Sequence, residues 1–252
     1  MVNAFSLAGK AAIVTGARRG LGRGIAVALA QHGADIVGVG TGDCADVKAE
    51  LEALGRRFVW VNADLTRQDK LDEIVDACVQ AFGGVDILVN NAGIIRRADS
   101  LDFSEQDWDD VMNINLKTAF FLSQRVARAF VAQGRGGKII NIASMLSYQG
   151  GIRVPSYTSS KSALKGLTMT LANEWAKYGI NVNAIAPGYM VTDNTELIRN
   201  DPARYQEILN RIPAGRWGTP EDLGPTAVFL ASDASAYVNG FTICVDGGYQ
   251  AR

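Results

Sequence analysis

The chain has 252 residues, 48% of them hydrophobic, and a formal net charge of −1 at pH 7. This length is enough to bury a full core, as one α/β domain or as two small ones. The near-neutral charge offers no basic field for nucleic acid, and no apolar run approaches the roughly 18 residues of a membrane span, so neither partner is expected.

The first strand and the glycine loop after it predict a nucleotide-binding unit. An apolar run at 10–15 leads into TGARRGLG at 15–22, and a helical pattern then continues to His32 and ends at Gly33. Glycines let the backbone approach a pyrophosphate, and a helix N-terminus offers unpaired N–H groups with a favourable dipole. The flanking strand and helix make this motif credible. His32, the single histidine, is expected to complement the dipole at the helix end, which excludes a Ser-His-Asp or histidine–metal mechanism.

Strands and helices then alternate along the chain with no linker or repeat. Further strands are expected at 34–39, 57–62, 85–89, 137–144, 180–186 and 241–245. Helices are expected at 46–54, 66–82, 104–132, 157–178, 201–211 and from 219 onward, three of them with capping signals at Thr66-x-x-Asp69, Ser104-x-x-Asp107 and Thr219-Pro220. The pattern predicts an α/β fold over 1–252, one doubly wound parallel sheet of about seven strands with helices on both faces.

Polar and glycine motifs follow the ends of several of these strands. They are Gly16 to Gly22, Asp64, Asn90 to Gly93, Ser144 and Pro187-Gly188. Ligands of such sheets bind beyond the carboxyl ends of the strands, so these residues are expected at one cleft. Tyr157 and Lys161 are four residues apart and share one helix face, where the lysine can lower the phenol pKa from about 10. For this spacing alone, a half-buried tyrosine and a solvated lysine would be the simpler interpretation.

Taken together, these motifs resemble the short-chain dehydrogenase/reductase family over the whole chain. The match consists of TGxxxGxG at 15–22, Asp64, NNAG at 90–93, Asn115, Ser144, YxxxK at 157–161 and PG at 187–188. The resemblance implies a Rossmann-like fold and an NAD(P)-dependent oxidoreductase acting on CH–OH groups.

The same resemblance implies a role for each site residue. Tyr157 would be the general acid/base, Ser144 would position the substrate carbonyl or hydroxyl, and Asn115 would support a water relay. Lys161 would lower the tyrosine pKa and hold the nicotinamide ribose, while Asp64 would lie at the adenine and Asn90 near the adenine ribose. The implied cofactor-binding residues are Gly16, Arg18, Arg19, Gly20, Leu21, Gly22, Gly40, Thr41, Asp64, Leu65, Asn91, Ala92, Gly93, Tyr157, Lys161, Pro187, Gly188, Val191 and Thr192.

Four stretches, at 91–97, 142–147, 150–157 and 212–218, are similar to members of the family that act on deoxy sugar acids from pectin or alginate breakdown. Arg96, Arg97 and Arg153 should flank the substrate mouth, where a guanidinium suits a carboxylate. An anionic sugar acid is therefore expected to contact Ser144, Tyr157, Arg153 and Arg96, with Arg97 less favoured. Alternatively, these arginines are ordinary surface residues.

The sequence carries signals for both NAD(H) and NADP(H). NAD-preferring members of the family usually carry an acid at the end of the second strand, where this chain has Gly40 and Thr41, although Asp43 could replace it. NADP-preferring members usually carry a basic residue before the second motif glycine, and Arg19 stands there beside Arg18. The resemblance to the sugar-acid group slightly favours NAD(H) over NADP(H).

Residues outside the cleft lead to three further predictions: a substrate lid, an oligomeric state and a cellular compartment. The mixed, polar stretch 189–216 is expected to be a mobile substrate lid.

The helices at 104–132 and 157–178 carry more apolar residues than one core-facing stripe requires. Members of the family pair through these two helices, so the resemblance predicts a homotetramer. These residues are Phe120, Phe121, Leu122, Met169 and Trp175. The scattered Cys44, Cys78 and Cys244, without CxxC spacing, fit reduced thiols in the cytoplasm and no metal site.

Two alternatives belong to other substrate or function classes. A reductase of the 3-oxoacyl-carrier-protein type would need a basic docking surface and an apolar groove, and 189–216 shows neither clearly. A nucleotide-sensing protein without turnover usually lacks the tyrosine or the lysine, whereas this chain retains Ser144, Tyr157 and Lys161.

Overall fold

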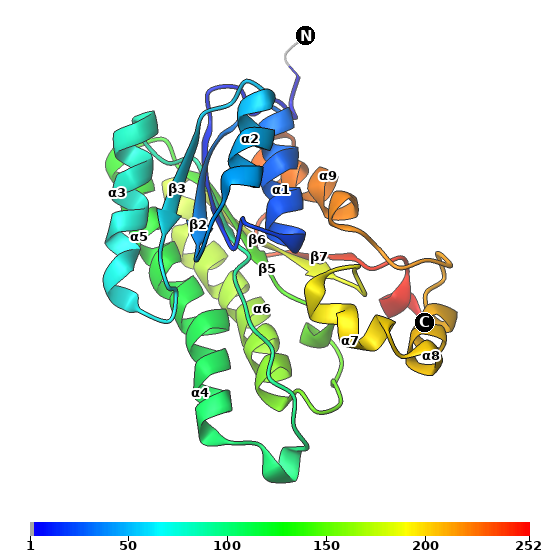
Figure 1. Cartoon of the computed structure of the whole chain (residues 1–252). Coiled ribbons are helices and arrows are strands. Elements are labelled where there is room, and N and C mark those ends of the chain that lie inside the picture. The colour runs from blue at the N-terminus through cyan, green and yellow to red at the C-terminus, as the bar shows by residue number, and fades with distance from the viewer. Residues whose placement is uncertain (1–2) are drawn as a thin grey trace.

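One sheet of seven strands runs through the part of the chain that the structure, a computed structural model, describes: residues 3–252 (Figure 1). The strands are β1 (Ala11–Thr15), β2 (Asp35–Gly40), β3 (Phe58–Asn62), β4 (Ile87–Asn90), β5 (Gly137–Ile142), β6 (Ile180–Pro187) and β7 (Thr242–Val245). They lie in the order β3-β2-β1-β4-β5-β6-β7, all parallel. The strand order reverses its direction between β1 and β4, which opens a crevice at their carboxyl ends. The predicted doubly wound sheet is confirmed.

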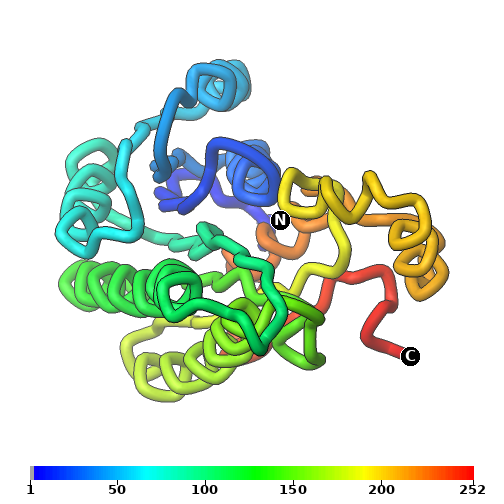
Figure 2. Tube along the Cα trace, turned by 60° about the horizontal axis from the view of Figure 1, so that its bottom comes forward, coloured from blue at the N-terminus to red at the C-terminus, as the bar shows by residue number. Residues whose placement is uncertain are grey.

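Helices cover both faces of this sheet, as Figure 1 and Figure 2 show. The helices on one face are α1 (Gly20–Gln31), α2 (Ala45–Ala53) and α9 (Pro220–Ala231). Those on the other face are α3 (Leu71–Phe82), α5 (Ala119–Gln133) and α6 (Pro155–Trp175). In the described part of the chain, no helix has both the length and the hydropathy that a membrane crossing requires.

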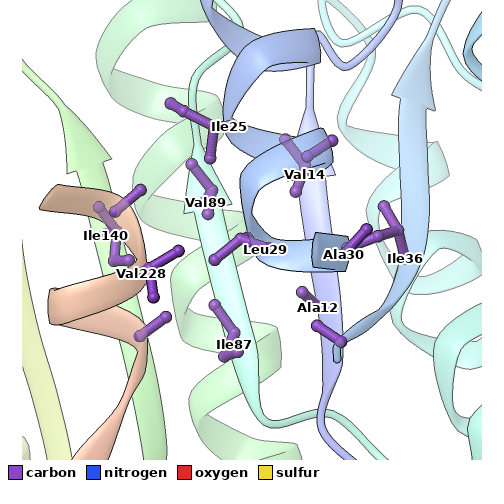
Figure 3. Packing of buried hydrophobic residues seen from close by; sticks show 14 of the residues in the cluster. Ala12, Val14, Ile25, Leu29, Ala30, Ile36, Ile87, Val89, Ile140 and Val228 are labelled. Carbon is purple, nitrogen blue, oxygen red and sulfur yellow. The ribbon is translucent and has the colours of Figure 1, made fainter. Parts of the chain in front are cut away.

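Alternate strand residues supply the two halves of the core. In β1, Val14 packs into the layer under α1 and α9, while Ile13 packs into the layer under α3 and α5. Figure 3 shows the first layer, where Leu29 of α1 and Val228 of α9 lie over the sheet. Successive side chains of a strand point to opposite faces, and here both faces are buried, which explains the continuous apolar runs of the sequence.

One predicted helix cap is confirmed and a second is wrong. Ser104 caps α4 (Glu105–Met112) as predicted, because its hydroxyl accepts a hydrogen bond from the Asp107 N–H at 3.1 Å. The Thr66 cap is wrong: the Thr66 N–H and hydroxyl both donate to the Asp64 carboxylate at 2.9 Å. A 3-10 turn follows at Gln68–Lys70, and α3 begins only at Leu71.

The long helix predicted at 104–132 is interrupted. Between α4 and α5, residues Asn113–Thr118 form a π-helical segment. Such wider turns are rare and occur often at functional sites. This one carries Asn115, which is 1% exposed.

Residues 189–216 contain more helix than was predicted. A 3-10 turn at Asp193–Thr195 leads into α7 (Glu196–Arg199), and the expected helix at 201–211 is α8 (Pro202–Arg211). Figure 2 shows this segment, in yellow and orange, beside the red segment that ends at Arg252. The Arg252 guanidinium donates to the Asn210 carbonyl at 2.6 Å, so the two segments are in direct contact.

Candidate active site

A cavity of about 400 Å³ lies at the carboxyl ends of β1 to β6. Most of the predicted cofactor and catalytic residues line it: Gly16, Arg18, Arg19, Gly20, Leu21, Gly40, Thr41, Asp64, Leu65, Asn91, Ala92, Gly93, Ser144, Tyr157, Lys161, Pro187, Gly188 and Thr192. The other predicted site residues, all within the described range, are not part of this lining: Gly22, Asn90, Arg96, Arg97, Asn115, Arg153 and Val191.

The glycine loop forms a tight cradle at the start of α1. Gly16 has φ 67°, and a Cβ there would lie 2.8 Å from the Asn91 side-chain amide. A Cβ on Gly22 would lie 2.2 Å from the Gly16 carbonyl, so Gly22 supports the loop from behind. No side chain caps the first turn of α1, which holds no acidic residue. Its N–H groups are therefore suited to an anion such as a pyrophosphate.

Hydrogen bonds fasten the loop after β4 to the end of β1. The Thr15 hydroxyl accepts from the Asn91 and Ala92 N–H groups, each at 3.0 Å, and the Asn91 amide donates to the Thr15 carbonyl at 2.8 Å. Asn90, expected near the adenine ribose, instead points into the protein and donates to Ser123 and Asn141. It is 5% exposed, because alternate residues at a strand end face opposite ways.

Asn115 links the loop after Gly93 to the catalytic helix. Its side-chain oxygen accepts from the Ile94 N–H at 2.8 Å, and its amide donates to the Ile94 carbonyl and to the Ser160 hydroxyl. Ser160 in turn donates to the Tyr157 carbonyl at 2.8 Å. All polar atoms of the Asn115 side chain thus have protein partners, and the π-helical segment aims this side chain at them.

Ser144, Tyr157 and Lys161 meet at the inner end of the cavity. The Ser144 hydroxyl accepts from the Leu146 N–H at 3.1 Å, which fixes its orientation at the start of a short 3-10 turn. The Lys161 ammonium donates to the Ile142 carbonyl at 2.6 Å and lies 5.7 Å from the centre of the Tyr157 ring. Helical spacing on α6 and the end of β5 bring these three groups together, as the sequence predicted.

Burial dominates the ionisation of the tyrosine and the lysine. Burial raises the pKa of the Tyr157 phenol, while its hydrogen bond with Ser144 and the charge of Arg97 act in the opposite direction. Burial also lowers the pKa of Lys161 from 10.5 to about 8. Desolvation disfavours the charged form of each group.

The lowered pKa of Lys161 predicts that the free energy of unfolding depends on pH. Between about pH 8 and 10.5 the unfolded chain holds a proton on Lys161 that the folded chain has lost. The free energy of unfolding should therefore rise with pH across this window, relative to the variant Lys161→Met. Urea unfolding of both proteins at several pH values measures the difference. A flat difference for Lys161→Met would show that the lysine is not desolvated.

The arginines lie differently from the prediction. Arg153 adopts the left-handed φ of 63°, and its guanidinium pairs with Asp99 at 3.0 Å on the surface. Arg96 pairs with the carboxylates of α4, at 3.1 Å from Asp107. Nearby acids hold both side chains. Arg97, ranked third from the sequence, has a charge that lowers the pKa of the Tyr157 phenol, and it donates to the Asn194 carbonyl at 3.0 Å. None of the three arginines is part of the cavity lining.

The two arginines of the glycine loop diverge. A Cβ on Gly42, just after β2, would lie 3.5 Å from the Arg18 guanidinium. Arg19 instead forms an ion pair with Asp193 at 2.8 Å. Asp43, the possible substitute acid, accepts from the Ala45 N–H at 3.0 Å and is not part of the cavity lining.

Known proteins share this fold and length. Residues 16–250 match the family described as enoyl-(acyl carrier protein) reductase. The chain is 61% identical over 252 residues to the 2-dehydro-3-deoxy-D-gluconate 5-dehydrogenase of Escherichia coli (strain K12), with 100% of both covered. A solved structure from Agrobacterium tumefaciens, described as a candidate 2-deoxy-D-gluconate 3-dehydrogenase with bound NADP, is 53% identical, covers 100% of both chains and has a TM-score of 0.94. A gluconate 5-dehydrogenase from Burkholderia cenocepacia J2315 in complex with NADP and tartrate is 38% identical, covers 99% of this chain and 98% of that one, and has a TM-score of 0.93.

Proposed function

The chain belongs to the short-chain dehydrogenase/reductase family, and on this premise we propose that it interconverts a secondary alcohol and a ketone on a deoxy sugar acid of the 2-dehydro-3-deoxy-D-gluconate type. One observation carries the reaction: a single cavity joins the glycine cradle of α1 to Ser144, Tyr157 and Lys161. The names of the similar proteins support the substrate class.

The residues of the cavity fit a nicotinamide dinucleotide. The cradle at Gly16 leaves no room for a Cβ, and the uncapped start of α1 suits a pyrophosphate. When bound, the cofactor supplies or accepts the hydride. Lys161 and Asn91 are proposed to hold it and Asp64 to lie at the adenine, and all three residues line the cavity.

Tyr157 is the proton donor and acceptor of this proposal. In reduction its phenol gives a proton to the carbonyl oxygen, and in oxidation the phenolate removes one from the alcohol. Ser144 holds the same oxygen by a hydrogen bond. Ser144 and Arg97 are the groups that lower the pKa of the Tyr157 phenol against the effect of burial. Lys161, whose own pKa burial lowers to about 8, is proposed to hold the nicotinamide ribose. Asn115 keeps the loop at Ile94 and the first turn of α6 in register.

Arg97 is proposed to bind the substrate carboxylate. Its charge lowers the pKa of the Tyr157 phenol, whereas Arg153 and Arg96 are held by surface acids. Arg97 does not itself line the cavity, but it contacts Asn194, which does, and residues 189–216 are proposed to close over this place as a lid. A guanidinium at this place suits a carboxylate and would favour acids over neutral sugars.

NADP(H) is the cofactor that this structure favours, although the sequence slightly preferred NAD(H). Arg18 lies beside Gly42 at the end of β2, where a 2′-phosphate would need a cation. Gly40 and Thr41 line the cavity there without a carboxylate to bind the ribose hydroxyls. Three similar solved structures are described with NADP, one of them at low occupancy.

A substrate panel tests the function. The purified protein would be offered 2-dehydro-3-deoxy-D-gluconate, D-gluconate and neutral sugars with NAD or NADP, and the matching ketones and a 3-oxoacyl thioester with the reduced cofactors. We expect the deoxy sugar acid to give the highest kcat/KM. Preference for the thioester would support the acyl-carrier-protein alternative, and cofactor binding without any turnover would support a sensor.

We also propose a homotetramer, in the cytoplasm, that pairs through α5 and α6. A groove of about 540 Å³ on these helices includes Phe120, Val131 and Trp175, and Val131 is 47% exposed. Leu122, counted on this surface from the sequence, is fully buried and belongs to the core instead.

Sedimentation equilibrium at micromolar concentration should give four copies for the wild-type protein. Val131→Asp, which adds a charge to the groove, should reduce the mass to that of a dimer or a monomer. Leu197→Asp changes a residue that is 78% exposed on α7 and should leave the mass unchanged. A wild-type monomer would contradict the proposal.

A further inference from the structure

A second cavity lies at the edge of the sheet opposite to the cofactor cavity. It measures about 600 Å³, and residues at or next to the amino ends of β1, β4, β5 and β6 line it. Lys10 and Asp86 directly precede β1 and β4, and Lys138 is the second residue of β5. The residues that line this amino-end cavity and the cofactor cavity, all within the described range, do not overlap. The two cavities are therefore separate.

Cations outnumber acids in the lining of the amino-end cavity. The charged residues are Lys10, Arg135 and Lys138, with Asp86 and Asp233. One Asp86 oxygen lies 3.9 Å from the Lys10 ammonium and 3.4 Å from the Arg135 guanidinium, and the other accepts from the Ala11 N–H at 2.9 Å. The Asp86 side chain is only 9% exposed, so this carboxylate is committed to the protein. One acid thus compensates one of the two cations that share it.

Lys138 carries a charge that is partly removed from water and has no acid of its own. Its ammonium donates to the Asn181 side-chain oxygen at 2.8 Å, and within residues 3–252 it forms no ion pair. The Asn181 amide donates to two backbone carbonyls at 236–238, each at 3.2 Å, which fixes its oxygen toward the lysine. Burial lowers the pKa of Lys138, while the charge of Asp233 opposes this shift and that of Lys10 adds to it. A desolvated cation with only a neutral acceptor is stabilised when an anion binds beside it.

We propose that the amino-end cavity binds a small hydroxylated carboxylic acid, whose carboxylate is held by Lys138 and Lys10. Three cations against two acids leave one positive charge, which a monocarboxylate balances. A phosphate group carries nearly two charges at pH 7 and would leave an excess negative charge beside Asp86.

The rest of the lining suits the remainder of such a ligand. Asp233, which begins a 3-10 turn, offers a carboxylate that can accept from hydroxyl groups. The ring of Tyr237 is fully exposed at the cavity and can cover a carbon skeleton. The volume of about 600 Å³ is within the usual range of small-molecule sites.

The two lysines differ in the size of their expected effects. Removal of the Lys138 charge should weaken binding of the acid about ten- to a hundredfold, the usual range for a charge-assisted hydrogen bond. The Lys10 side chain is 42% exposed and already shares Asp86, so its removal should weaken binding only about two- to fivefold.

Methyl NMR of isoleucine-labelled protein tests the site, because different isoleucines line the two cavities. Ile87 and Ile180 line the amino-end cavity, and the cofactor cavity has its own set, Ile94, Ile114 and Ile142. Titration with D-gluconate should shift the Ile87 and Ile180 signals, and the neutral D-glucose should not. Any binding of D-gluconate in the cofactor cavity would be seen separately, on the other three signals.

Variants assign the response to the lysines. Lys138→Met should weaken the D-gluconate response of Ile87 and Ile180 about tenfold or more, and Lys138→Arg should restore part of it. Lys10→Met tests the site independently, with a loss of about two- to fivefold. Lys48→Met removes an exposed lysine of α2 and is the control that should leave the response unchanged.

Four outcomes would overturn the proposal. They are shifts confined to the isoleucines of the cofactor cavity, an equal response in Lys138→Met, an equal affinity for D-glucose, and tighter binding of inorganic phosphate than of D-gluconate. The NMR response does not require turnover. A protein that showed it without oxidising or reducing sugar acids would contradict the proposed function and leave this site intact.

Discussion

Replacing Tyr157 by phenylalanine should lower turnover by about a hundredfold or more, in both directions of the reaction. The variant keeps the aromatic ring on α6 and removes only the hydroxyl that exchanges the proton. Cofactor affinity should stay within about twofold, because the ring still fills its place in the cavity. Steady-state kinetics with the deoxy sugar acid and a direct cofactor titration measure the two quantities.

Tyr178→Phe is the matched control for this change. Tyr178 lies in the 3-10 turn that follows α6 and is 46% exposed, so the loss of its hydroxyl should leave kcat unchanged. If Tyr157→Phe kept nearly normal turnover, another group would have to carry the proton. In that case the assignment of the whole cluster with Ser144 and Lys161 would be wrong.

Replacing Arg97 by alanine should raise the KM for the sugar acid about ten- to a hundredfold, the usual range for one charge-assisted bond. The KM for a neutral ketone of similar size should change little. The positive charge of Arg97 also lowers the pKa of the Tyr157 phenol, so its loss should shift the basic limb of the pH profile to higher pH. Arg97→Lys should restore part of the affinity, because a point charge replaces a two-pronged donor.

Arg96→Ala and Arg153→Ala are the controls for Arg97. Both residues form surface ion pairs, with Asp107 and with Asp99, and should alter the KM of acid and neutral substrates equally or not at all. A selective loss of acid binding in Arg153→Ala would restore the prediction made from the sequence. Equal constants for acid and neutral substrates in Arg97→Ala would remove arginine from carboxylate recognition.

The fold could be predicted from the sequence because each strand and helix is marked by residues within its own segment. Apolar runs of four to eight residues, each ended by glycine or a polar motif, marked β1 to β6, and the motifs at their ends predicted the crevice. The positions of Ser144, Tyr157 and Lys161 followed from strand ends and helical spacing. These relations do not depend on distant partners.

The arginines were harder to place because distant residues hold them. Arg153 seemed to face the cleft, but a left-handed backbone and Asp99 turn it to the surface, and neither is visible in its own segment. Arg19 finds its partner 174 residues along the chain. The π-helical segment around Asn115 was missed because no residue type marks a single wider turn inside a long helical pattern.

The contact between Arg252 and α8 has a practical consequence for labelling. Because the Arg252 guanidinium donates to the Asn210 carbonyl, any group attached at residue 252 lies against α8. An affinity tag there would press on this helix. A small fluorophore at the same place would detect any motion of α8 during turnover, whereas one attached at exposed Phe5, which lies against Phe229 of α9, would serve as a reference.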